Sequence, residues 1–140
     1  MNSLFEVTIG DIKVTNGTNI PFDKSQINSN IRIDEQLTKT KYHTVIMVDP
    51  DAPSKENPIY KYWLHYLSIN NNTSNIMSYE KPTPPPGSGK HRYIFYLLEQ
   101  PNKFDKNMFH IDRRKNFNLG EFIIDNNLKE VTCVYFTTER

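Results

Sequence analysis

Two aspartates and two prolines follow one another directly after an apolar segment of the chain. Asp49, Pro50, Asp51 and Pro53 come after residues 42–48, which read Tyr-His-Thr-Val-Ile-Met-Val. Proline donates no hydrogen bond to a neighbouring strand and disfavours helix at the preceding residue, so a strand must end here. Two acceptor carboxylates are therefore held on a stiff loop at a strand end, where binding sites are common. We call residues 49–55 the acidic loop. The same residues are equally typical of an ordinary Asp/Pro turn.

Histidines stand near the starts of two further apolar segments. Trp63 and His65 are two positions apart, as are His91 and Tyr93, and in a strand each pair shares a face. The same alternation predicts that Leu67 lies on the face of His65. If the segment that ends in the acidic loop runs antiparallel to both others, the imidazoles and carboxylates meet at one sheet edge. Imidazole, indole and phenol groups would then offer N–H and O–H donors to an anionic ligand, and an aspartate would orient one imidazole.

The elements that must position these side chains are short and mostly extended. Runs of β-branched and aromatic residues between turn residues predict strands over 5–9, 12–14, 31–33, 42–48, 63–69, 92–98 and 131–136. A helix is predicted over 119–127, because Asn118 can cap it and Glu121 falls at the position of a capping-box partner. This pattern predicts an all-β dominated fold, an antiparallel β-sandwich with Greek-key connections and one or two short helices. A length of 140 residues suits a single domain over 1–140.

Charge and hydropathy exclude several classes of protein. The 17 basic residues nearly balance the 16 acidic ones, so no strong field attracts DNA or RNA, and we expect no nucleic-acid partner. No apolar run is long enough for a transmembrane helix, and the first residues lack the pattern of a secretory signal peptide. We therefore expect a soluble, cytoplasmic protein without a transmembrane segment.

Three segments together resemble the signature blocks of one family. They read DPDAPSK at 49–55, WLHYLSIN at 63–70 and PPPGSGKHRYIFYLLEQ at 84–100. In order and spacing they are similar to the phosphatidylethanolamine-binding protein family, which has kinase-inhibiting, plant flowering-signal and carboxypeptidase-inhibiting members. The tail over 114–136 extends the likeness towards the plant branch.

The resemblance implies a large antiparallel sheet packed on a smaller one, with a pocket at one end of the strands for phosphate-like and phosphoethanolamine-like groups. Carried over position by position, the ligand-binding residues are Asp49, Pro50, Asp51, Pro53, Tyr60, Trp63, His65, His91 and Tyr93. The predicted function is binding of a small phosphorylated or phospholipid-headgroup ligand, with a kinase or other signalling protein as a second partner. No catalysis, cofactor or metal is predicted. We also expect at least one cis X–Pro bond, before Pro53 or within 84–86.

Other interpretations of these residues stay open. The protein could instead inhibit a kinase or serine protease by docking, with the pocket incidental. A hydrolase that uses the Asp/His cluster as acid and base is less favoured, because Ser88 in Gly-Ser-Gly lacks the strand-turn-helix context of a nucleophile elbow. A metal site is disfavoured because no closely spaced ligand pair exists. His43 and His110 are interpreted as structural or solvent-exposed.

Overall fold

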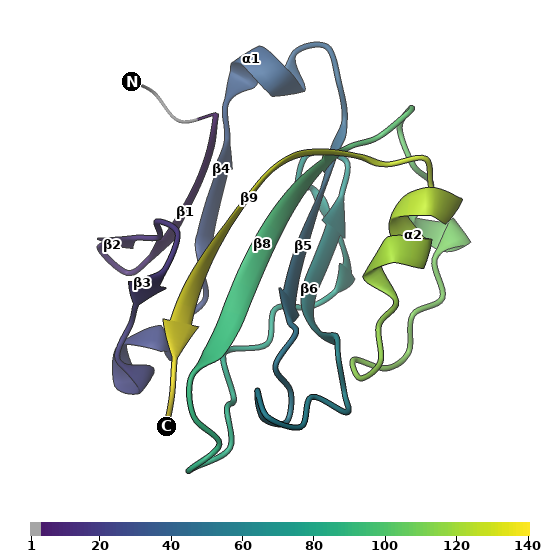
Figure 1. Ribbon diagram of the computed structural model, residues 1–140. Helices are drawn as coiled ribbons and strands as arrows, with labels where there is room; N and C mark the ends of the chain where they lie inside the picture. Colours follow the sequence, from purple (N-terminus) through teal and green to yellow (C-terminus); the bar gives the residue numbers. More distant parts are fainter. Residues whose placement is uncertain (1–3) are drawn as a thin grey trace.

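The computed structural model describes residues 4–140, which form two β-sheets with short helices (Figure 1). Within this part of the chain the strands are β1 Phe5–Ile9, β2 Ile12–Lys13, β3 Thr18–Asn19, β4 Asn30–Ile33, β5 His43–Asp49, β6 Trp63–Ile69, β7 Ser74–Met77, β8 His91–Glu99 and β9 Lys129–Thr138. The α-helices are α1 Glu35–Thr38 and α2 Leu119–Asp125, and 3-10 turns lie at η1 Phe22–Ser25 and η2 Lys106–Met108. A strand-dominated fold with short helices is thus confirmed.

The strand order places β5 deep in the larger sheet. One sheet has the order β2-β1-β4, and the other has the order β3-β9-β8-β5-β6-β7. All neighbours are antiparallel except β3 and β9, which run parallel. The prediction of antiparallel sheets is wrong for this pair, because the chain after β2 turns back along the outer edge of β9. There Ile20 N donates to Thr137 O at 2.9 Å.

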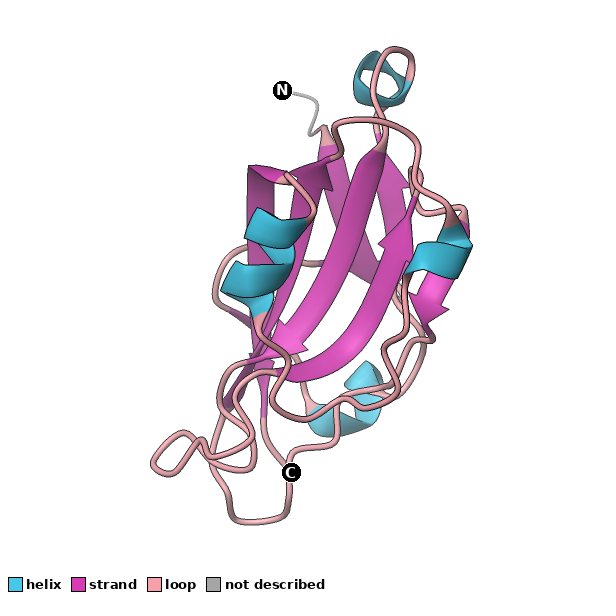
Figure 2. Cartoon of the chain, turned by 90° about the vertical axis from the view of Figure 1, so that its right-hand side faces the viewer, coloured by secondary structure: helices cyan, strands magenta, loops and turns pink. Residues whose placement is uncertain are grey.

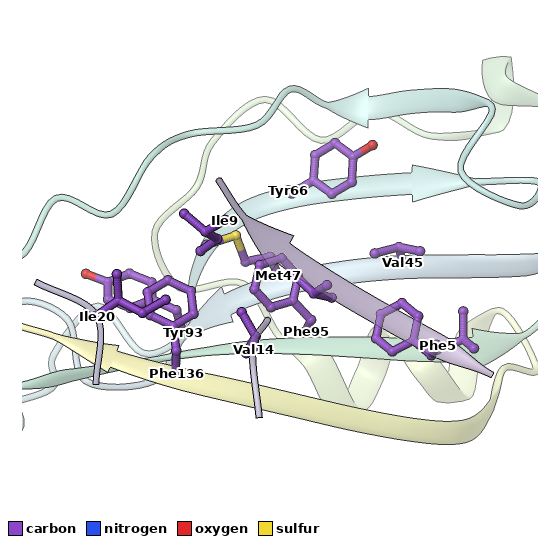
Figure 3. Packing of buried hydrophobic residues seen from close by; sticks show 12 residues of the cluster. Phe5, Ile9, Val14, Ile20, Val45, Met47, Tyr66, Tyr93, Phe95 and Phe136 are labelled. Atoms are coloured by element: carbon purple, nitrogen blue, oxygen red, sulfur yellow. The ribbon is translucent and has the colours of Figure 1, made fainter. Parts of the chain in front are cut away.

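Two apolar cores flank the larger sheet. The first lies between the sheets, where Phe5, Val7 and Ile9 of β1 pack against residues such as Phe95 and Phe136 (Figure 3). The second lies on the other face, beneath α2 and the connection that precedes it (Figure 2). Every residue of β5 is buried. This agrees with its apolar sequence on both faces, since a central strand covered on both sides has no solvent face.

The helix over the second core begins as its sequence predicts. Asn118 Oδ1 accepts a hydrogen bond from Glu121 N at 3.0 Å, and Asn118 Nδ2 donates to Glu121 Oε2 at 3.1 Å. Asn118 thus satisfies one backbone donor of the first turn, and the Glu121 carboxylate bonds the Asn118 side chain instead of the Asn118 backbone N–H of a complete capping box. The helix ends at Asp125, two residues before the predicted boundary, and Asn127 turns the chain with φ of 50°.

A β-bulge in β6 changes which side chains share a face. Met47 of β5 is paired with Tyr66, whereas Val48 is paired with Leu64, so His65 is an additional residue in β6. The extra residue shifts the alternation that follows it. Leu67 therefore packs with Leu64 in the second core, on the face opposite to His65. The prediction that Leu67 shares the face of His65 is wrong for this reason.

A candidate ligand-binding pocket at one edge of the large sheet

A cavity of about 190 Å³ opens where β5 ends and β6 and β8 begin. Its wall comes from the acidic loop, β6, β8 and the loops that precede these two strands: Asp49, Ala52, Pro53, Tyr60, Trp63, His65, Thr83, Pro85 and His91. Because β5 is antiparallel to both neighbours, its end meets the starts of the other two strands. Six of the nine predicted ligand-binding residues line this cavity, and Pro50, Asp51 and Tyr93 do not. The Ala52–Pro53 peptide bond is cis, as predicted.

Asp49 holds the imidazole of His91 in one orientation. His91 Nδ1 donates to Asp49 Oδ2 at 2.7 Å, and both side chains are buried. The second carboxylate oxygen of Asp49 accepts from the backbone N–H of Asp51 at 2.7 Å. The other ring nitrogen, His91 Nε2, lies 2.9 Å from Ser88 Oγ. The aspartate thus fixes the orientation of the imidazole and leaves Nε2 as the nitrogen that faces Ser88.

His65 is held through a backbone carbonyl. Its Nδ1 lies 2.7 Å from Glu80 O, and a carbonyl oxygen can only accept, so Nδ1 carries the proton. Burial lowers the pKa of His65, although the nearby Glu80 groups oppose this shift. At neutral pH the ring is therefore uncharged and offers Nε2 as an acceptor. Anion binding at this nitrogen requires an additional proton.

A second layer of side chains supports the pocket from behind. Glu80 Oε1 accepts from Trp63 Nε1 at 2.7 Å, so the indole N–H that we expected to face a ligand is already bonded. Arg114 Nε lies 3.5 Å from Glu80 Oε2, and Arg114 Nη1 donates to the carbonyl oxygens of Leu64 and His65 at 3.1 and 3.0 Å. Sequence reasoning missed Glu80 and Arg114. Only the position of Arg114 at the start of the family-like tail pointed to it.

Asp51 anchors the acidic loop and does not line the cavity. It accepts from the backbone N–H of Arg92 at 2.9 Å and from Arg92 Nε and Nη2 at 3.0 and 2.9 Å. Burial alone would raise the pKa of the Asp51 carboxyl, but the hydrogen bonds from Arg92 outweigh burial and lower it. Pro50, which follows Asp49, is buried beside this anchor. Both residues shape the loop, which corrects their predicted place in the ligand pocket.

Tyr93 supports the two imidazoles from inside the core. Its ring meets the edge of the His65 ring at a centroid distance of 5.1 Å and stacks on the His91 ring at 6.4 Å. The side chain is fully buried, and its hydroxyl has no hydrogen-bond partner among the described residues. Burial raises the pKa of this phenol. Tyr93 therefore packs against both histidine rings, and it is not among the residues that line the cavity, where we predicted it.

The remaining histidines lie outside the cavity wall. His43 is buried, and its Nδ1 lies 2.9 Å from Asn71 Oδ1, whereas His110 is exposed in the connection before α2. Both placements agree with their interpretation as structural or solvent-exposed. Residues 4–140 contain no cluster of three or more side chains suited to a metal ion. In the same range, no helix has the length and apolar content needed to cross a membrane.

Comparison with known proteins agrees with this architecture. Residues 10–136 match the sequence model described as Phosphatidylethanolamine-binding protein. The chain is 45% identical over 146 residues to a phosphatidylethanolamine-binding protein homolog of Acanthamoeba polyphaga mimivirus, with 100% of both chains covered. It is 32% identical over 143 residues to Protein FLOWERING LOCUS T of Arabidopsis thaliana, covering 96% of this chain and 79% of that protein.

Solved structures show the same fold. A carboxypeptidase Y inhibitor, solved in complex with its cognate proteinase, superposes with a TM-score of 0.82 at 26% identity, covering 96% of this chain and 82% of the inhibitor. A phosphatidylethanolamine-binding protein from Plasmodium vivax superposes with a TM-score of 0.79 at 19% identity, covering 97% of this chain and 84% of that one. From its sequence and its fold, the chain belongs to the phosphatidylethanolamine-binding protein family.

Proposed function

We propose that the protein binds a small anionic ligand, of the phosphate or phospholipid-headgroup type, in the cavity at the end of β5. The observation that carries this proposal is the pair of imidazoles, His65 and His91, in the wall of one cavity of about 190 Å³. Each ring is held from behind, His65 by Glu80 O and His91 by Asp49. Side chains that are already fixed lose little conformational entropy when a ligand binds, which favours affinity.

The chemistry of the wall indicates how an anion would be held. Within the described residues, the cavity wall includes no lysine or arginine. A phosphate oxygen at His65 therefore needs a proton, carried either by His65 Nε2 or by the phosphate group itself. For a phosphodiester or sulfate, which carries no proton near neutral pH, binding is thus coupled to uptake of a proton by His65 from solution.

The aromatic part of the wall suits the other end of an ethanolamine headgroup. The rings of Tyr60 and Trp63 lie 6.1 Å apart, and both face the cavity. Such rings attract an ammonium group through their negative faces. Lys115 Nζ already lies 5.8 Å from the Tyr60 ring centroid, which shows that a cation can occupy the surroundings of this ring. A zwitterionic phosphoethanolamine group matches both halves of the pocket.

Calorimetry with glycerophosphoethanolamine tests the proposal, because this phosphodiester carries the headgroup without acyl chains. We expect wild-type protein to bind it, and we expect His65→Ala to lose at least about tenfold in affinity, or about 1.4 kcal/mol. His110→Ala is the matched control, since it removes an exposed imidazole from the connection before α2. Equal affinity of the His65→Ala and His110→Ala variants would refute the proposed site.

A second candidate function is inhibition of a serine protease or a kinase by docking. It is favoured by the structural likeness to a carboxypeptidase Y inhibitor that was solved with its proteinase. A serine carboxypeptidase should then lose activity when it is incubated with this protein. Inhibition that persists in His65→Ala but falls when exposed Ile59 is replaced by Asp would assign the effect to the surface and not to the pocket.

A further inference from the structure

Three side chains beside the cavity, Ser88, His91 and Asp49, lie in a row, each within hydrogen-bond distance of the next. Ser88 Oγ lies 2.9 Å from His91 Nε2, and His91 Nδ1 lies 2.7 Å from Asp49 Oδ2. This is the order of groups in a nucleophile, a general base and an orienting carboxylate. We propose that Ser88 is an activated nucleophile that accepts the acyl group of a small carboxylic ester. The inference goes beyond ligand binding and gives the same pocket a covalent step.

The protons of these three groups can adopt the arrangement that the step requires. The Asp49 carboxylate accepts from His91 Nδ1–H, so the neutral ring leaves Nε2 as an acceptor for the Ser88 hydroxyl. Ser88 Oγ also lies 2.6 Å from Pro85 O, and one hydroxyl proton can point to only one of these acceptors at a time. Rotation of the hydroxyl alone converts the resting arrangement into the reactive one.

The turn that carries Ser88 leaves space for a substrate. Gly87 and Gly89 have φ of 77° and 83°, and a Cβ added to either would meet no atom within 4 Å. Pro85 and His91, on either side of Ser88 in sequence, line the cavity. Within residues 4–140, the backbone N–H groups of Gly89 and Lys90 donate no hydrogen bond to another backbone or side-chain group. They can donate to a carbonyl oxygen as negative charge develops on it.

The step balances without a cofactor. Ser88 Oγ forms a bond to the carbonyl carbon of the ester while its proton passes to His91 Nε2. The bond from that carbon to the alcohol oxygen then breaks, and the alcohol leaves with the proton from His91. The acyl group remains on Ser88. Water can attack the acyl carbon in the same way, giving its proton to His91 and restoring the Ser88 hydroxyl when the carboxylic acid leaves.

A fluorophosphonate probe tests the nucleophile without requiring the natural ester, because an activated serine displaces fluoride and keeps the phosphonyl group. We expect intact-mass analysis of the wild-type protein to show one adduct, which peptide mapping places on Ser88. Ser88→Ala should lose the adduct, and Asp49→Asn should slow labelling by more than about 100-fold. Ser54→Ala is the matched control, because the hydroxyl of this loop serine accepts from Asn57 N and, within residues 4–140, has no hydrogen bond to an imidazole. It should label as the wild type does.

Release of p-nitrophenol from p-nitrophenyl acetate, followed on the same samples, measures acyl transfer itself. An adduct on another serine, or equal labelling of wild type and Ser88→Ala, would overturn the inference, as would an unlabelled wild type. Glycerophosphoethanolamine binding by Ser88→Ala separates the two proposals. Retained binding with lost labelling supports both, whereas retained binding with no labelling in the wild type leaves the binding function standing alone.

Discussion

Anion binding by this pocket should weaken as the pH rises, because it needs a proton on His65. Sulfate is a suitable probe, since its charge does not change in the neutral range. The free ring is neutral because burial lowers the pKa of His65, and Nδ1 is already committed to Glu80 O. A bound anion stabilises the imidazolium and raises the pKa of His65 in the complex. Binding is therefore strongest at low pH and is lost as pH rises through the pKa of the complex.

The size of the effect follows from the geometry of an ion pair. An anion about 4 Å from the imidazolium contributes about 4 kcal/mol at an effective dielectric constant of about 20, equal to about 3 pKa units. Between the pKa values of the free and bound protein, affinity should fall about tenfold for each pH unit, or about 1.4 kcal/mol. Within that window, about one proton should be taken up for each anion bound.

Calorimetry in two buffers with different protonation enthalpies measures both quantities. We expect His65→Gln to abolish the pH slope while it keeps a polar side chain in the wall. His110→Gln should leave the slope unchanged, since His110 lies outside the cavity. A flat profile in the wild-type protein would show that backbone amides, and not His65, hold the anion. A slope that persists in His65→Gln would assign the proton to another group.

Three further substitutions probe the support of the pocket. Tyr93→Phe should leave the free energy of unfolding unchanged or higher in thermal melts, because it removes a buried hydroxyl without a described partner. Asp51→Asn should lower the free energy of unfolding by about 1–3 kcal/mol, because it weakens the charged hydrogen bonds from Arg92. It should also reduce the loss of this free energy at acid pH, because those bonds lower the pKa of Asp51. A denaturant titration at two pH values checks this, and an unchanged midpoint would contradict it. Arg114→Ala should weaken sulfate binding about tenfold, because it frees Glu80, the residue that orients Trp63. Equal affinity of this variant and the wild type would make Arg114 purely structural.

Much of the fold could be predicted from local sequence. The apolar run before Asp49 and the two prolines that follow it place the end of β5 within one residue, since proline cannot continue a strand. The Asn118 and Glu121 pair predicted the start of α2. These features depend on near neighbours in the chain. The parallel pairing of β3 with β9 joins segments more than a hundred residues apart, and local periodicity carries no information on it.

The candidate pocket could likewise be predicted only in part from the sequence. Residue type and position near strand ends were sufficient to select Asp49, His65 and His91, because a site for a polar ligand needs donors and acceptors where strands stop. Which groups each residue would bond could not be predicted. The bulge at His65 depends on the pairing of β5 with β6, and it moves Leu67 to the opposite face. The contact of Ser88 with His91 depends on how the glycine turn folds back onto its own strand.

The sequence alone determined the family, the strand segments and the polar residues available for a site, since each depends on residue types at short spacing. Tertiary structure decided the role of each residue, because hydrogen bonds are shared among groups that are distant in the chain. In the folded chain Asp51 accepts hydrogen bonds from Arg92, Tyr93 is buried against the imidazoles, and Trp63 donates a hydrogen bond to Glu80. A buried polar group must find a partner wherever the fold supplies one, and that partner decides whether the group can serve a ligand.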